Sequence, residues 1–111
     1  MLTAEKTRAE LLWLAPLFVV CAPVVEEYVF RAWMLERFSR VMPAWLALVL
    51  TALAFAAVHV PQDAVPALEL AVGGALLGLT WLWTRSWLAC ALAHGFYNGA
   101  VLLALWVALP S

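Results

Sequence analysis

Residues 86–109 read SWLACALAHGFYNGAVLLALWVAL, a stretch that contains no Asp, Glu, Lys or Arg. A helix that crosses the hydrocarbon core of a bilayer needs about 20 consecutive, mostly apolar residues. Residues 43–60 and 64–84 are also mostly apolar and of similar length, with Glu69 as their one charged residue. Lipid offers no partner to backbone polar groups, so such stretches are expected to be helical. They therefore predict a helical membrane protein.

The overall composition agrees with a membrane protein. The chain has 111 residues, of which 68% are hydrophobic and only 12% are charged, and its mean hydropathy is +0.99. Soluble domains are about half apolar and about a quarter charged. The length predicts one domain over residues 1–111. The net charge of -1, without a basic run, indicates no nucleic-acid partner.

An additional apolar segment, residues 10–41, is too long for a simple span and is polar towards its C-terminal end. Pro16 and Pro23 predict a kink or a break in it. The connections between the four segments are short, so neighbouring helices should run antiparallel. We therefore expect an all-α, polytopic bundle of about four transmembrane helices. Three glycines of the third segment form a small-residue face that predicts close helix packing, namely Gly73, Gly74 and Gly78.

Ionisable side chains inside these apolar stretches are the informative feature of the sequence. A charge near the middle of a bilayer costs a few kcal/mol or more, and such residues tend to face the interior of the bundle and to mark function. The set, with one polar amide, is Glu26, Glu27, Arg31, His59, His94 and Asn98.

The two adjacent glutamates are expected to have different roles. Glu27 and Arg31 are four residues apart, so they share a helix face and can form an ion pair. Glu26 points about 100° away from Glu27, because a helix has about 3.6 residues per turn. We therefore expect Glu26 to face a reaction centre.

The other polar residues repeat the spacing of four. His94 and Asn98 share one helix face, and Phe55 and His59 share another. Taken singly, a buried ion pair, a packed histidine or an amide between helices is more often structural than catalytic. Their joint occurrence in so apolar a chain favours a functional site.

These residues carry a resemblance to a known family, the type II CAAX prenyl proteases with their bacterial relatives, the glutamic intramembrane proteases of the bacteriocin-processing group. That family has three motifs on separate helices. The first, Glu-Glu-x-x-x-Arg, is present at residues 26–31, the second, Phe-x-x-x-His, at 55–59, and the third, His-x-x-x-Asn, at 94–98. The resemblance implies an intramembrane endopeptidase without a cofactor.

The resemblance also implies the roles of single residues. Glu26 and His59 would activate a water, and His94 and Asn98 would stabilise the oxyanion, while Arg31 would position Glu27. The chemistry is reasonable, because desolvation disfavours the charged form of a carboxylate and suits it to act as a base. A good oxyanion donor contributes about 3–4 kcal/mol. Phe55 would support His59.

Two alternatives stay open. Glu26, His59 and His94 are also of the types that bind zinc, so a zinc-dependent membrane protease is one. Against it, the sequence has no His-Glu-x-x-His motif, and Asn98 is a poor zinc ligand. The other is a non-catalytic membrane scaffold or an immunity protein against a peptide toxin.

The expected partners are the lipid bilayer and a membrane-anchored or prenylated protein substrate. The resemblance implies a multi-pass protein of a bacterial or archaeal cell membrane. Members of the family are usually longer, with helices before the first motif, so an oligomer is a further possibility. No residue distinguishes between a prenylated substrate and another membrane-anchored one.

Overall fold

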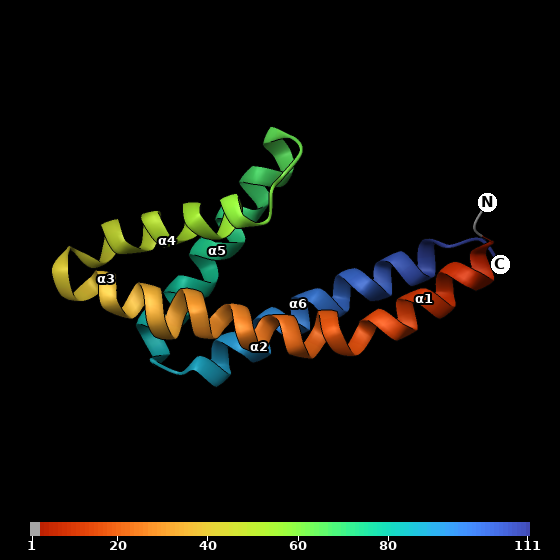
Figure 1. The fold of residues 1–111 in the computed structure, drawn as a ribbon, viewed down its shortest axis with the longest axis horizontal. Helices are drawn as coiled ribbons and strands as arrows, with labels where there is room; N and C mark the ends of the chain where they lie inside the picture. Colours follow the sequence, from red (N-terminus) through yellow and green to blue (C-terminus); the bar gives the residue numbers. More distant parts are fainter. Residues whose placement is uncertain (1–2) are drawn as a thin grey trace.

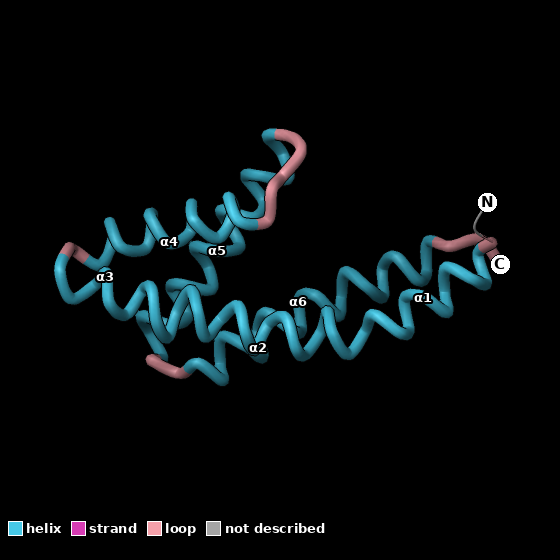
Figure 2. Tube along the Cα trace, viewed as in Figure 1, coloured by secondary structure: helices cyan, strands magenta, loops and turns pink. Residues whose placement is uncertain are grey.

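The computed structural model describes residues 3–111 and is helical throughout, with short connections (Figures 1 and 2). The all-α prediction is confirmed, since residues 3–111 contain no strand. One long helix covers Ala4–Val41. The elements are α1 (Ala4–Pro16), the π-helical η1 (Leu17–Cys21), α2 (Ala22–Glu27), the π-helical η2 (Tyr28–Leu35), α3 (Glu36–Val41), α4 (Ala44–Val58), α5 (Ala64–Thr84) and α6 (Trp87–Ala108).

The second apolar segment is shorter as a helix than its sequence predicts. Within residues 3–111, three helices are long and apolar enough to cross a membrane, whereas α4 has 15 residues. At about 1.5 Å per residue, α4 is shorter than the hydrocarbon core, which is about 30 Å thick. It stops at Val58 because the next two backbone N–H groups bond three residues back, and Val60 has a φ of 49°. His59 thus lies at the end of a short helix.

Of the kink or break predicted at the prolines, the break is wrong, because the helix is continuous through both of them. Pro16 ends α1, and Pro23 lies in the first turn of α2. Between them, the backbone N–H of Ala22 bonds to the carbonyl of Leu17, five residues back, which is the π-helical pattern. The helix therefore absorbs the prolines by a local change of winding.

The helices form two pairs that diverge from a shared centre (Figure 1). The helix α4 packs along α5, and α1 with η1 runs beside α6. Among the described elements, α4 makes no close backbone contact with α6. The middle of the long helix, α2 and η2, joins the pairs by packing on α6 and on α4 and α5.

The predicted small-residue face is confirmed at two of its three glycines. A Cβ added at Gly74 would lie 3.3 Å from the Cα of Ala52, and one added at Gly78 would collide with the side chain of Leu48. These glycines let α5 approach α4 closely. A Cβ at Gly73 would meet nothing within 4 Å, so Gly73 takes no part in this packing.

Candidate active site

Three of the predicted site residues converge at the centre where the helix pairs meet. The Oε1 atom of Glu26 lies 3.6 Å from Nε2 of His59, and its Oε2 atom lies 3.5 Å from Nε2 of His94. Glu26 and His59 are each 28% exposed, whereas His94 is 7% exposed. The carboxylate thus lies between two imidazoles and keeps access to the outside.

Hydrogen bonds to the far nitrogen of each ring determine which tautomer faces Glu26. The Nδ1 atom of His59 lies 2.6 Å from the carbonyl oxygen of Phe55, which can only accept, so Nδ1 carries the hydrogen. The Nδ1 atom of His94 lies 2.9 Å from the carboxylate of Glu27 and donates to it in the same way. In the neutral rings, both Nε2 atoms therefore present lone pairs to Glu26.

Glu27 and Arg31 form the ion pair that their spacing predicts. The Nε atom of Arg31 lies 3.3 Å from Oε2 of Glu27, and both side chains are at most 1% exposed. Arg31 also donates to the backbone carbonyl of Gly74, at 2.6 Å. Sequence spacing did not indicate the bond from His94 to Glu27, because the two residues lie on helices distant in the chain. Glu27 thus connects the first motif to the third.

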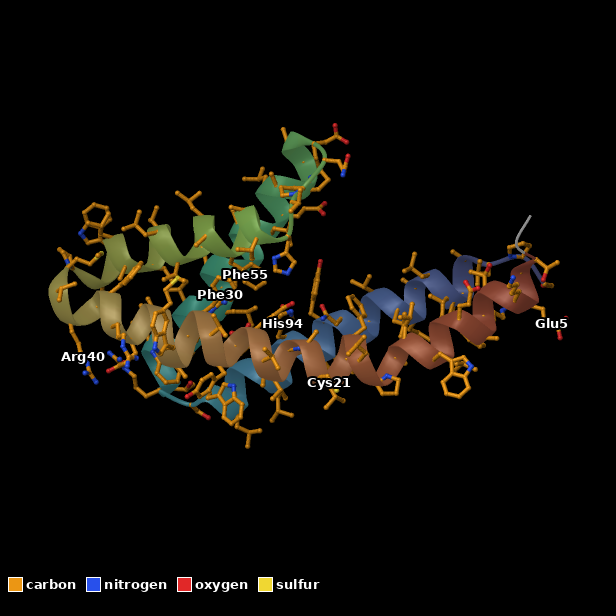
Figure 3. All side chains as sticks on the ribbon, in the orientation of Figure 1. Glu5, Cys21, Phe30, Arg40, Phe55 and His94 are labelled. Carbon is orange, nitrogen blue, oxygen red and sulfur yellow. The ribbon has the colours of Figure 1, made fainter. Side chains whose placement is uncertain are left out.

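The Phe55 ring packs against most of the charged site. It lies 4.5 Å from the ring of His59 and 5.9 Å from that of His94, measured between centroids. The guanidinium of Arg31 lies 4.8 Å from the Phe55 centroid, within the range of a cation–π interaction. Phe55 also meets Phe30 edge-on, and it is 4% exposed. Figure 3 shows Phe55, Phe30 and His94 in one region of the molecule.

Asn98 makes a contact that the sequence did not predict. Its amide nitrogen donates to the backbone carbonyl of Phe18, at 2.9 Å, and the residue is 8% exposed. Phe18 belongs to η1, so this bond joins α6 to the π-helical turn. One of the two amide hydrogens of Asn98 is therefore engaged within the protein.

Gly95, which sequence reasoning did not select, sets the approach of α6 to η1 beside the site. Gly95 and Gly99 form a Gly-x-x-x-Gly pattern, a known signature of close packing between membrane helices. A Cβ added at Gly95 would lie 2.6 Å from the carbonyl oxygen of Val19. Only glycine allows this approach of α6 to η1, and the pattern itself could have indicated it.

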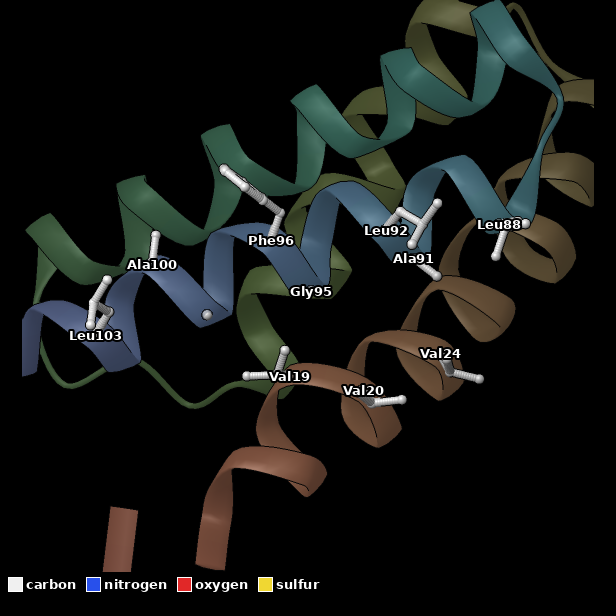
Figure 4. Close-up of a pocket in the computed structure, with 11 residues that line it drawn as sticks. Val19, Val20, Val24, Leu88, Ala91, Leu92, Gly95, Phe96, Ala100 and Leu103 are labelled. Atoms are coloured by element: carbon white, nitrogen blue, oxygen red, sulfur yellow. The ribbon is translucent and has the colours of Figure 1, made fainter. Parts of the chain in front are cut away.

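An apolar groove of about 710 Å³ runs between α6 and the helix formed by η1 and α2 (Figure 4). Val19 and Val24 lie on one wall, and Leu92 and Gly95 on the other. Glu26, His59 and His94 are not among its lining residues. The groove is therefore distinct from the polar site.

The donor types for the zinc alternative are present, since Glu26, His59 and His94 lie together. Within residues 3–111, however, no group of three or more His, Cys, Asp and Glu side chains has an arrangement that could hold a metal ion. Chelation is thus the direct way to examine this alternative.

The fold and the site define an integral membrane protein with a glutamate and two histidines gathered between its helices. A family model described as "Type II CAAX prenyl endopeptidase Rce1-like" matches residues 8–100, well over half of the chain. The chain belongs to this family, a family of CAAX-type intramembrane proteases. The resemblance carried by the three motifs is thereby confirmed. No curated protein and no solved structure matches the chain.

Proposed function

We propose that this chain is an endopeptidase that hydrolyses a peptide bond of a membrane-anchored or lipidated protein with a water activated by Glu26 and His59. The observation that carries the proposal is the placement of Glu26 between two Nε2 atoms, at 3.6 and 3.5 Å. These separations are too long for direct hydrogen bonds. Glu26 and Nε2 of His59 both act as acceptors, so a water that donates one hydrogen to each is the molecule that suits the gap between them.

The first step is the attack of this water on the substrate carbonyl. The water donates one hydrogen to Glu26 and the other to Nε2 of His59, which leaves an oxygen lone pair for the carbonyl carbon. Glu26 takes the proton as the carbon–oxygen bond forms, acting as the general base. The partly enclosed position of Glu26 suits this role, since exclusion of solvent strengthens electrostatic interactions within the site.

The second requirement is stabilisation of the oxyanion. His94 can donate from Nε2 only if its ring carries both protons, because Nδ1 already donates to Glu27. The carboxylates of Glu26 and Glu27 flank the ring and would offset its positive charge. The second amide hydrogen of Asn98 is the other donor of the proposal. Such preorganised donors are commonly a large part of catalysis.

Collapse of the tetrahedral intermediate completes the reaction. Glu26 returns its proton to the leaving nitrogen as the carbon–nitrogen bond breaks, which releases an amine and a carboxylic acid. Glu26 is then ionised again and can accept a new water. The cycle uses one water for each bond cleaved and forms no covalent intermediate with the protein.

The experiment is a cleavage assay of the purified full chain in detergent. The substrates are a panel of prenylated CAAX-type peptides and unprenylated, membrane-anchored peptides. The variants are wild type, Glu26→Gln and the control Glu69→Gln, an exposed glutamate on α5. Each is assayed with and without a strong zinc chelator.

We expect cleavage to survive the chelator, to survive in Glu69→Gln and to vanish in Glu26→Gln, because an amide cannot accept the proton of the water. Loss of wild-type cleavage with the chelator, restored by zinc, would instead establish the zinc-dependent protease. Full cleavage by Glu26→Gln would exclude Glu26 as the base. Protection against a peptide toxin that persists in Glu26→Gln would favour the non-catalytic role.

A further inference from the structure

The carbonyl of Phe18 lacks both of its regular helical donors. In an α-helix it would accept from the N–H of residue 22, but the N–H of Ala22 bonds to Leu17. In a π-helix it would accept from the N–H of residue 23, but Pro23 has no N–H. The combination of a π-helical turn and a proline therefore leaves this carbonyl without a partner in its own helix.

A side chain from α6 supplies the missing donor. The amide nitrogen of Asn98 lies 2.9 Å from the Phe18 oxygen, in a part-buried position. The close contact depends on Gly95, where a Cβ would lie 2.6 Å from the Val19 oxygen. At Gly99, one turn further along α6, a Cβ would have an ordinary contact distance of 3.8 Å from Val19. The approach of the two backbones is thus tightest beside Asn98.

This bond ties the helix that carries Glu26 to the helix that carries His94. A π-helical turn includes about one extra residue compared with an α-helical turn, and one residue corresponds to about 100° of rotation. The direction of Glu26 relative to α1 therefore depends on whether the π-helical turn is kept before it. We call the bond from Asn98 to the Phe18 carbonyl the clamp. His94 and Asn98 are four residues apart on α6, so the amide of the clamp and the imidazole share one helix face.

We infer that the bond from Asn98 to the Phe18 carbonyl holds the π-helical turn in place and thereby aims Glu26 at His59 and His94. Asn98 is then a positioning residue in addition to its proposed part in the oxyanion site. Pro23 and Gly95 are positioning residues as well, Pro23 because it frees the carbonyl and Gly95 because it lets α6 reach it. The consequence for cleavage rests on the proposed function, whereas the clamp itself does not.

A double-mutant experiment separates the clamp from direct action on substrate. Asn98→Ala removes the donor, and Pro23→Ala restores an N–H at position 23. With the π-helical turn retained, this N–H lies five residues beyond Phe18 and gives the Phe18 carbonyl a donor again. The full chain is studied in detergent as wild type, as each single variant and as the double variant.

Two spectroscopic readouts need no substrate. Phe18–Val19 is the one Phe–Val step in the chain, so a carbonyl-¹³C phenylalanine and ¹⁵N valine label reports the Phe18 carbonyl selectively. The chain has only two histidines, so the ¹⁵N signals of both imidazoles can be assigned and report the position of Glu26. The melting temperature and kcat for the best substrate complete the set.

For Asn98→Ala we expect an upfield shift of the Phe18 carbonyl, displaced Nε2 signals of both histidines, a lower melting temperature and a loss of at least tenfold in kcat. In the double variant we expect all of these to move back, with kcat at least tenfold above that of Asn98→Ala. If the Pro23→Ala single variant keeps the wild-type histidine signals, recovery of the Phe18 signal in the double variant without recovery of the histidine signals would overturn positioning and leave a structural bond only. No shift of the Phe18 carbonyl in Asn98→Ala would overturn the clamp itself.

The outcome is distinct from that of the proposed function. If wild type cleaves no peptide, the proposed function fails, while the Phe18 and histidine signals still decide the clamp. If the histidine signals recover in the double variant but kcat does not, the loss of cleavage in Asn98→Ala comes from a missing contact with substrate, and the contribution of positioning to cleavage is overturned. Gly95→Ala should reproduce the spectral changes of Asn98→Ala, because its Cβ would push the two backbones apart. Its matched control, Gly99→Ala, should leave the spectra unchanged.

Discussion

The Nδ1 atom of His94 lies 2.9 Å from Oε1 of Glu27, and the other oxygen of the same carboxylate lies 3.3 Å from Nε of Arg31. One buried carboxylate therefore neutralises an arginine and also orients an imidazole. The adjacent Glu26 faces the opposite nitrogen of that imidazole. Two consecutive glutamates thus approach the same histidine from its two ends, one to hold it and the other, as proposed, to act as base.

Replacement of Glu27 should separate its two tasks. Glu27→Gln leaves the charge of Arg31 buried without compensation, and we expect a loss of about 3–5 kcal/mol in the free energy of unfolding. A double variant of Glu27→Gln and Arg31→Met also lacks the buried positive charge, so it should recover most of this lost stability. Cleavage should stay low in the single and in the double variant, because an amide at position 27 fixes the tautomer of His94 less firmly than the carboxylate does. Unfolding titrations in mixed detergent and kcat are the measurements, and full cleavage in the double variant would contradict the orienting role.

The ring protonation states are open to direct measurement. Both histidines in their neutral form should carry the hydrogen on Nδ1, because His59 donates to the Phe55 carbonyl and His94 to Glu27. Free histidine favours the other tautomer, so ¹⁵N chemical shifts distinguish the two cases. Glu27→Gln should alter the pattern of His94 and leave that of His59 unchanged. A protonated Nε2 on neutral His59 would contradict the proposed arrangement of the water.

Two neighbouring glycines on α5 should respond oppositely to the same substitution. Gly74→Ala would place a Cβ 3.3 Å from the Cα of Ala52 and 3.2 Å from the Phe55 ring, so we expect overpacking that costs about 1–3 kcal/mol. Gly73→Ala meets nothing within 4 Å and should stabilise the helix by up to about 1 kcal/mol. The measurement is the melting temperature of each variant and of wild type in the same detergent. Equal destabilisation by both would contradict the described contact of α4 with α5.

The aromatic character of Phe55 should matter more to the site than its volume does. Phe55→Leu keeps an apolar side chain but removes the ring from the guanidinium of Arg31, an interaction of about 0.5–2 kcal/mol, and from His59. We expect a moderate loss of stability and a larger fall in kcat, since His59 loses the surface against which it packs. Phe38→Leu, at a residue packed against the Leu35 cluster, is the matched control and should change kcat little. Equal kcat in both variants would remove Phe55 from the site.

Part of this architecture follows from the sequence because it depends on local chemistry. The apolar stretches predict helices in lipid whatever their neighbours are, and the all-α prediction is confirmed. The spacing of four puts Glu27 beside Arg31 on the same face, and the structure has that ion pair. Position along one helix is sufficient for both results.

The structure differs from the sequence-based expectation where backbone hydrogen bonding has more than one solution. Pro16 and Pro23 predicted a kink or a break, but the helix does not break, because a π-helical turn and a donor from a distant helix let it continue. Residues 43–60 predicted a full span, but the helix ends at Val58 and leaves His59 at its end. Neither outcome is visible in a hydropathy pattern, because it depends on what lies opposite each backbone carbonyl.

The sequence by itself determined a helical membrane protein, its three motifs and which residues of each motif share a face. Only the tertiary structure decided which faces meet: the carboxylate of Glu26 between His59 and His94, Glu27 on the far nitrogen of His94, and Asn98 on the Phe18 carbonyl. Helical periodicity sets the direction of a side chain relative to its own axis. The approach of two axes depends instead on residues that leave no polar signal, such as Gly95 and Gly74, where the absence of a Cβ lets backbones come together.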